Sequence, residues 1–189
     1  MNNLDNLPEL NRMAVLRSIG QDAPFTRMDI VRKVNLSLPT VANILTGLVD
    51  DGYVLVIGNG ESRGGRPPTL YRLNPRARFA IGIEFRLPKL AIGLVDFQNN
   101  LIALDEYPFA DDIDLTHISA TLLDGIAKLL DEQGLATDKL VGIGLGIPGF
   151  VDSETGVWLR YPRIPTVRDV PIRVPLAERF GVPVFIQNE

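Results

Sequence analysis

The 189-residue sequence has no cysteine, a single histidine (His117) and a single tryptophan (Trp158). Without cysteine the chain can form neither disulfides nor thiolate metal sites, and one histidine argues against a histidine-rich metal site. No apolar run approaches the roughly 18 residues that a membrane-spanning helix needs. The N-terminus also lacks the basic and apolar pattern of a signal peptide. We therefore expect a cytoplasmic protein with no metal site and no membrane association.

The formal net charge of −4 is divided unevenly along the chain. Residues 1–78 contain 10 Lys and Arg against 7 Asp and Glu, which gives +3, whereas residues 79–189 contain 9 against 16, which gives −7. A basic head joined to an acidic body is expected if only the head meets phosphate groups. We predict two domains with these bounds, and the modest positive charge of the first supports nucleic-acid binding without proving it.

Three helices separated by turn signals are predicted in the first 51 residues. Apolar residues recur at helical spacing in the first of them, at Leu10, Met13, Leu16 and Ile19. Thr26 and Asp29 have the spacing of a capping box, so a short second helix is expected to begin at Arg27. A three-residue turn follows, and Ser37 can cap a third helix with Pro39 in its first turn, where a missing N–H is tolerated.

The predicted third helix, residues 38–51, has two distinct faces. Its core-facing positions are apolar and three or four residues apart, at Val41, Ile44, Leu45, Leu48 and Val49. Two helices joined by a tight turn, with small polar groups on the second, are typical of a helix-turn-helix that enters the major groove. Asn43 can pair with adenine, and Thr40 can contact phosphate or a thymine methyl. We predict DNA contacts at Arg27, Ser37, Pro39, Thr40 and Asn43. The alternative is a helical hairpin with a solvated face.

A hairpin is predicted directly after the third helix. Residues 53–57 and 69–73 read as strands, and the segment between them is rich in glycine and carries Arg63 and Arg66. Arg66 lies between a glycine and a proline, and such a narrow strip can place an arginine in the minor groove of A·T-rich DNA. The alternative is a surface loop, but the neighbouring helix-turn-helix favours a wing. We predict a winged helix-turn-helix whose wing binds DNA through these two arginines.

The remainder of the chain has the element order of an α/β fold. Three predicted strands are followed by a helix, a strand, a helix and a strand, at residues 79–84, 90–96, 101–107, 114–132, 140–147, 172–180 and 182–186. Ligands of such sheets gather at the carboxyl ends of strands, so the loops after Ile147 and Ile186 form the candidate ligand site. Trp158 is predicted to pack in the lobe or on its surface rather than to act as a sugar platform.

Two segments of this part resemble the signature of the ROK family of repressors, open reading frames and kinases. They are Gly142-Ile-Gly-Leu-Gly-Ile-Pro-Gly-Phe-Val-Asp-Ser-Glu-Thr-Gly156 and Tyr161-Pro-Arg-Ile-Pro-Thr-Val-Arg-Asp-Val-Pro171, and residues 176–189 continue the resemblance. The head, with its Gly-Arg-Pro-Pro motif, is similar to the winged helix of ROK repressors. The resemblance implies an α+β chain: a winged helix-turn-helix followed by the first α/β lobe of an actin-like, hexokinase-like (ribonuclease H-like) ATPase fold. It also implies sugar binding in the cleft between two lobes and homo-oligomeric repressors.

Three positions depart from the pattern of the ROK kinases. The kinases carry an Asp-x-Gly-x-Thr phosphate loop after the first strand, and residues 84–89 have neither its glycines nor its threonine. Backbone cradling of ATP phosphates in the family's manner is therefore excluded. Glu189 stands where the kinases have an Asp that acts as general base, and its side chain would displace the carboxylate by about one methylene. Arg163 stands where the family often has Asn.

These observations predict a DNA-binding transcription factor rather than an enzyme, namely a repressor of sugar-utilisation genes. We expect it to bind a double-stranded operator as a homodimer or higher oligomer and to need no cofactor. A sugar or sugar derivative would be its effector, held by Gly149, Arg163, Asn188 and Glu189. The alternatives are a ROK-type kinase that phosphorylates a hexose with ATP, and a regulator that has lost sugar sensing or binds an acidic or modified sugar. Because the family's second lobe would follow Glu189, we also expect a truncated chain.

Overall fold

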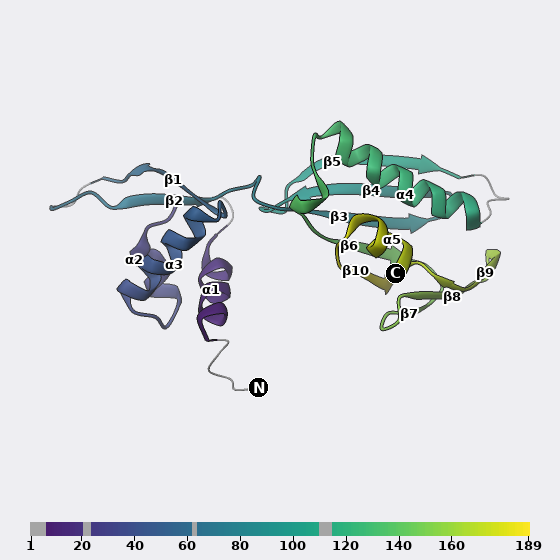
Figure 1. Cartoon of the computed structure of the whole chain (residues 1–189), viewed down its shortest axis with the longest axis horizontal. Helices are drawn as coiled ribbons and strands as arrows, with labels where there is room; N and C mark the ends of the chain where they lie inside the picture. The colour runs from purple at the N-terminus through teal and green to yellow at the C-terminus, as the bar shows by residue number, and fades with distance from the viewer. Residues whose placement is uncertain (1–6, 21–23, 62–63, 110–114) are drawn as a thin grey trace. The chain divides into compact units, whose positions relative to one another are not determined.

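The structure is a computed structural model that describes residues 7–20, 24–61, 64–109 and 115–189 (Figure 1). The chain divides into two compact units, residues 1–77 and residues 78–189. Within the described ranges, no helix is both long and apolar enough to cross a membrane. Each unit buries apolar side chains of its own, so each can be described by itself.

The first unit contains three helices followed by a two-stranded hairpin. Its elements are α1 (Leu7–Ser18), α2 (Arg27–Lys33), α3 (Leu38–Asp50), β1 (Val54–Asn59) and β2 (Thr69–Leu73). The capping box predicted for α2 is present, because Thr26 and Asp29 each accept a hydrogen bond from the other's backbone N–H. Ser37 caps α3 as predicted, and Gly52 follows that helix with a φ of +76°, which favours glycine.

The helices and the hairpin of this unit share one small core. Its buried apolar side chains are Val15, Ile19, Phe25, Ile30, Val41, Leu45, Leu48, Val54, Tyr71, Leu73 and Ala77. Phe25 and Tyr71 exchange two backbone hydrogen bonds of 2.9 Å, which tie the connection between α1 and α2 to β2. Leu10 and Met13, which belong to the pattern that predicts α1, are 53% and 42% exposed, because the side of α1 that carries Val15 meets the core.

The second unit is a mixed α/β structure built on a five-stranded sheet of order β10-β6-β3-β4-β5. Its elements are β3 (Phe79–Arg86), β4 (Lys89–Asp96), β5 (Leu101–Pro108), α4 (Leu115–Glu132), the 3-10 helix η1 (Thr137–Lys139), β6 (Leu140–Ile147), α5 (Arg173–Phe180) and β10 (Val184–Asn188). β3, β6 and β10 run parallel to one another, whereas β4 pairs antiparallel with both of its neighbours, β3 and β5. The strands and helices predicted here are present, with ends shifted by a few residues.

One face of this sheet is covered by both helices of the unit. Residues alternate along β3 between buried and less buried positions, so that Ile81 and Ile83 point into the core. They share one buried cluster with Ile126 of α4 and Leu176 of α5, which places both helices on the same face (Figure 1). Glu84, Arg86 and the other exposed residues of β3 therefore lie on the opposite face.

A three-stranded antiparallel sheet between β6 and α5 was missed by the sequence-based prediction. It consists of β7 (Phe150–Asp152), β8 (Val157–Tyr161) and β9 (Ile164–Pro171). Proline, glycine and Asx turn signals interrupt this segment, so no strand pattern is long enough to be recognised. Trp158 is buried, donates from Nε1 to the Pro148 carbonyl oxygen at 2.8 Å and packs against Phe85, which confirms it as a packing residue.

Candidate functional site

The N-terminal half of α3 presents polar side chains to solvent. Pro39 and Asn43 are exposed. Ser37 and Thr40 are joined through their hydroxyl oxygens at 2.8 Å, and the Ser37 oxygen also accepts from the Thr40 backbone N–H at 3.3 Å. The cap thus fixes both hydroxyls at the start of the helix, while each oxygen keeps capacity for a further hydrogen bond. These four predicted DNA contacts occupy one short stretch of the chain.

Arg27, the fifth predicted contact on the helices, is held by β2. Its Nε donates to the Tyr71 hydroxyl at 2.9 Å, and its guanidinium carbon lies 5.8 Å from the centre of the Tyr71 ring. The residue as a whole remains exposed. No local sequence pattern predicts this pairing, because the two residues are 44 positions apart. Tyr71 therefore limits where the Arg27 guanidinium can reach.

The hairpin between β1 and β2 carries the remaining predicted DNA contacts. Arg66 is exposed near its tip, and Arg63 lies outside the described residues. Gly64 and Gly65 have φ values of +99° and +101°, which side chains other than glycine rarely adopt. A backbone bond of 2.8 Å from the Gly60 N–H to the Pro68 carbonyl oxygen extends the pairing beyond β1. The hairpin thus brings Arg66 into the open on a narrow strip of backbone.

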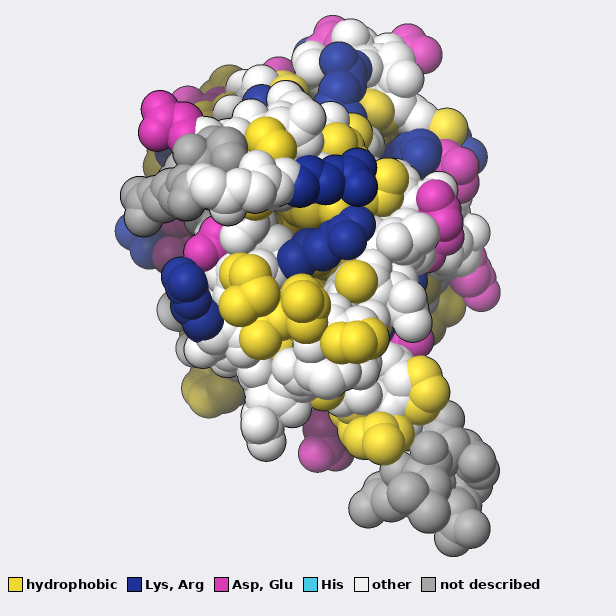
Figure 2. All heavy atoms as spheres, turned by 90° about the vertical axis from the view of Figure 1, so that its left-hand side faces the viewer, with side chains coloured by type: hydrophobic (Ala, Val, Ile, Leu, Met, Phe, Trp, Pro, Cys, Tyr) yellow, Lys and Arg dark blue, Asp and Glu magenta, His cyan; other side chains and the backbone are white. Residues whose placement is uncertain are grey.

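Basic side chains dominate the exposed charges of the described part of the first unit. Exposed Lys and Arg are Arg17, Arg27, Arg32, Lys33, Arg66, Arg72 and Arg76. Figure 2 shows Lys and Arg side chains lying beside apolar ones on the face that it views. The exposed apolar side chains of α2, α3 and β1 are Met28, Leu38, Val56 and Ile57. A surface of this composition suits a partner that offers both phosphate groups and apolar base edges.

Asp29 is an acidic side chain within this basic unit, and its role is structural. Its carboxylate accepts hydrogen bonds of 2.8 Å from the backbone N–H and the hydroxyl of Thr26. The bond from the backbone N–H of Thr26 is the main reason why the pKa of Asp29 lies below its ordinary value. The ionised carboxylate therefore stabilises the start of α2, next to Arg27.

In the second unit, three of the four predicted ligand residues gather at one edge of the large sheet. β3, β6 and β10 are parallel, so their carboxyl ends meet there. The Asn188 side-chain amide donates to the Gly149 carbonyl oxygen. The Glu189 backbone N–H donates to the Ile147 carbonyl oxygen at 3.2 Å. Arg163 lies exposed in the turn between β8 and β9. Among the described residues, it forms no hydrogen bond or ion pair with these three.

Gly149 cannot carry a side chain in this arrangement. Its φ is +92°, and a Cβ atom built there would meet the Arg160 carbonyl oxygen and lie 3.2 Å from the Tyr161 Cα atom. Arg173 secures the loop that follows, because its guanidinium donates to the carbonyl oxygens of Ser153 at 2.6 Å and Val184 at 3.0 Å. No local sequence pattern predicts this role of Arg173, because its partners are distant along the chain.

The Glu189 carboxylate is paired with an arginine of β3. Arg86 donates to Glu189, and its Nε lies 3.6 Å from a carboxylate oxygen of Glu84. The family resemblance predicts that residues 84–89 stand where the kinases carry their phosphate loop. The only sequence signal for this cluster was the lack of the phosphate-loop glycines and threonine in residues 84–89. That signal did not predict the pairing of Arg86 with Glu189.

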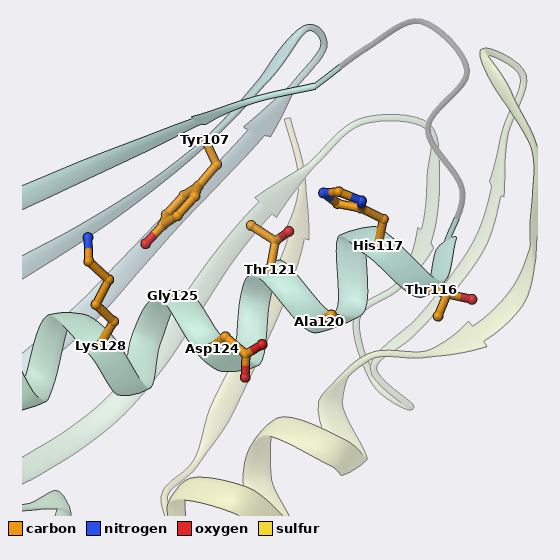
Figure 3. Close-up of a pocket in the computed structure, with 8 residues that line it drawn as sticks. All are labelled: Tyr107, Thr116, His117, Ala120, Thr121, Asp124, Gly125 and Lys128. Carbon is orange, nitrogen blue, oxygen red and sulfur yellow. The ribbon is translucent and has the colours of Figure 1, made fainter.

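A separate open groove of about 680 Å³ lies between β5 and α4. Figure 3 shows Tyr107 and Lys128 on its walls, together with polar side chains of α4 such as Thr121 and His117. Asp105 binds both walls, since it accepts from the Lys128 Nζ at 2.9 Å and from the Tyr107 hydroxyl at 3.2 Å. The first bond lowers the pKa of Asp105 and raises that of Lys128, while burial raises the pKa of Tyr107. None of the predicted ligand residues lines this groove.

No cluster of three or more His, Asp or Glu side chains suited to a metal ion occurs in the part of the chain that the structure describes. The binding groups of the strand-end edge are instead an amide, carboxylates, a guanidinium and backbone carbonyls. Such groups can hold hydroxyl-bearing ligands by hydrogen bonds.

Comparison with known proteins assigns these features to a family. The ROK family model matches residues 80–189. The xylose repressor of Caldicellulosiruptor bescii is 31% identical over 189 residues, covering 100% of this chain and 47% of that protein. The DNA-binding transcriptional dual regulator NagC of Escherichia coli is 28% identical, covering 99% of this chain and 46% of that protein.

The chain thus spans about half the length of the curated relatives that it matches. A crystal structure of a ROK family transcriptional regulator, described as a homologue of the E. coli MLC protein, superimposes with a TM-score of 0.71 at 23% identity. It covers 97% of this chain and 46% of that one, so the shared fold extends over both units of the chain.

Proposed function

The chain belongs to the ROK family, and from this premise we propose that it is part of a DNA-binding transcriptional repressor controlled by a sugar. α2, α3 and the β1–β2 hairpin would act as a winged helix-turn-helix, with residues 1–78 as the DNA-binding domain and residues 79–189 as the first lobe of the sugar-binding domain. The observation that carries the proposal is the outward display of Pro39, Asn43 and Arg66 on a helix and an adjoining hairpin of one compact unit. The names of the relatives, which are repressors and regulators, support it.

In this proposal α3 enters the major groove and the hairpin follows the adjacent minor groove. Asn43 reads a base edge, whereas Ser37, Thr40 and Arg27 contact the phosphate backbone and fix the register. Arg63 and Arg66 bind the narrow minor groove of A·T-rich sequence. A homodimer would set two such helices about one helical turn apart on a palindromic operator, roughly 34 Å.

The sugar would bind at the carboxyl edge of β3, β6 and β10, through Gly149, Asn188 and Glu189, with Arg163 approaching from the β8–β9 turn. A repressor can respond to such a ligand only if the ligand binds its DNA-bound and free conformations with different affinities. The proposed effector therefore favours a conformation or a dimer arrangement in which the two DNA-binding units do not fit adjacent half-sites.

The decisive experiment selects DNA from a random pool with the intact protein and then measures affinity for the selected site by fluorescence anisotropy. We expect Asn43→Ala to weaken binding by about 5- to 150-fold, since a bidentate base contact is worth about 1–3 kcal/mol. Asn11→Ala on α1, which removes the same amide from a half-buried position, should leave affinity unchanged. A sugar panel that includes D-xylose and N-acetyl-D-glucosamine should contain a compound that releases the DNA.

Failure to enrich any sequence would overturn the DNA-binding part of this proposal. Enrichment with no response to any sugar would leave a regulator without sugar sensing, which is the second reading of the sequence. The same preparation, incubated with ATP and common hexoses in a coupled assay, should form no sugar phosphate, because residues 84–89 offer no glycine backbone for phosphate binding.

A further inference from the structure

The arginine at the end of β3 lies between two carboxylates at the strand-end edge. Arg86 donates to Glu189 on one side and approaches Glu84 at 3.6 Å on the other. β3 and β10 are not neighbours in the sheet, because β6 lies between them. On this face Gly146 of β6 pairs with Glu84 of β3 and with Gln187 of β10, so Arg86 and Glu189, each two residues further along its own strand, meet beyond the end of β6.

These three side chains are open to a ligand. Their exposed fractions are 55% for Glu84, 68% for Arg86 and 32% for Glu189. The guanidinium cancels one of the two carboxylate charges, so the cluster keeps a net charge of −1. Lys89, the next basic residue along the chain, is paired with Glu106. The edge therefore offers carboxylate oxygens to hydroxyl donors and repels a second anion.

We propose that Arg86 is a positioning residue that holds the Glu189 carboxylate ready to accept sugar hydroxyls, and that the Glu84–Arg86–Glu189 cluster restricts the effector to unphosphorylated sugars. The inference rests on the proposed function, which places the effector at this edge. It specifies the class of effector, unphosphorylated sugars, which the fold alone does not determine. A sugar phosphate would bring about −2 charge to a cluster that is already negative and whose own arginine is occupied by Glu189. Within the part of the chain that the structure describes, the exposed Arg163 of the β8–β9 turn forms no hydrogen bond or ion pair with this cluster and does not change its charge.

The first experiment compares free sugars with their phosphate esters on the intact protein. Calorimetric titrations would use D-xylose with D-xylose 5-phosphate, and N-acetyl-D-glucosamine with its 6-phosphate. We expect the free member of the binding pair to bind at least about tenfold more tightly than its ester. If the ester binds equally well or better, this inference is wrong and the proposed function stands. If neither pair binds although DNA is bound specifically, the effector site of the proposed function fails and the inference fails with it.

The second experiment asks whether Arg86 acts through Glu189. Arg86→Ala should weaken binding of the free sugar by about tenfold, the scale of one charge-assisted hydrogen bond, and Arg86→Lys should restore part of the loss. In a Glu189→Gln background the additional effect of Arg86→Ala should fall below about twofold, because its target carboxylate is gone. An equal loss in both backgrounds would contradict positioning.

A charge-matched control is available on α5. Arg179→Ala removes the same charge from an exposed position on a helix that covers the other face of the sheet, and it should leave sugar affinity unchanged. The melting temperature of each variant, measured beside its affinity, identifies any change caused by misfolding. If Arg179→Ala weakens binding as much as Arg86→Ala, the effect is one of total charge and the specific role of Arg86 is excluded.

Discussion

Residues 1–77 and residues 78–189 place their candidate binding groups in opposite ways. In the first unit these groups project outward, as Asn43 does from α3 and Arg66 from the hairpin. In the second they converge, as Asn188 bonds to Gly149 beside the Glu189–Arg86 pair. The grooves of a DNA duplex are read by groups that protrude into them, whereas a small ligand needs groups that surround it. The opposite net charges of the two parts follow the same division.

The largest expected effect is the loss of stability on truncating a core side chain, and it tests whether the two cores are independent. Leu45 of α3 has no exposed surface, so Leu45→Ala should destabilise the first unit by about 2–5 kcal/mol. Hydrogen exchange on the intact protein should show lost protection in α1, α2 and α3 but not in the five-stranded sheet. Leu129→Ala in α4, which is 1% exposed, should give the reverse pattern. Equal loss in both units for either variant would mean that they unfold as one.

The convergent site depends on a backbone that only glycine permits. Gly149→Ala should destabilise the second unit by about 1–3 kcal/mol or more and abolish sugar binding, because its φ is +92° and its Cβ would meet the backbone of Arg160. Gly144→Ala on β6 is the matched change, since nothing lies within 4 Å of a Cβ there. Thermal unfolding and sugar titration of both variants check this contrast, and a tolerated Gly149→Ala would contradict the geometry of the loop.

The projecting site should depend on salt in a way that the convergent site does not. Arg66→Ala should make the negative slope of log affinity for DNA against log salt concentration shallower by about 1, since one phosphate-region contact is lost. It should also reduce the preference for A·T-rich flanks. Arg168→Ala, an exposed arginine of β9, removes the same charge from the second unit and should leave the slope unchanged. A slope unaffected by Arg66→Ala would remove the hairpin from the DNA interface.

The smallest expected effect concerns pH and the first unit alone. The pKa of Asp29 is lowered by folding, so its stabilisation is complete above its unfolded value of about 4 and is lost as pH falls through the lower folded value. Asp29→Asn should therefore reduce the stability of the first unit by about 1 kcal/mol or less at pH 7. The difference from wild type should shrink in denaturant titrations near pH 3. Asp138→Asn in η1 serves as the control, and a difference that grows in acid would be the opposite of what the capping box requires.

Local signals predicted much of the fold because they act over a few residues. The capping box of Thr26 and Asp29, the Ser37 cap and the apolar spacing of α3 are complete within single turns of helix, and each is present in the structure. The same reasoning did not detect β7, β8 and β9, because turn residues interrupt these short strands.

For the candidate site, too, the sequence predicted one part and only the tertiary structure revealed another. Its position at the ends of β6 and β10 followed from the order of strands and helices, and the structure brings Gly149, Asn188 and Glu189 together there. The contacts of Arg27 with Tyr71 and of Arg86 with Glu189 join residues 44 and 103 positions apart, and no local pattern announces either of them.

Composition, helix caps and strand periodicity alone determined that this chain has a basic helical head and an acidic α/β body, since these properties belong to neighbouring residues. Tertiary structure alone decided which charges meet. The order of strands in the large sheet brings Arg86 and Glu189 together beyond the end of β6, and such a juxtaposition exists only after distant segments have packed into one sheet.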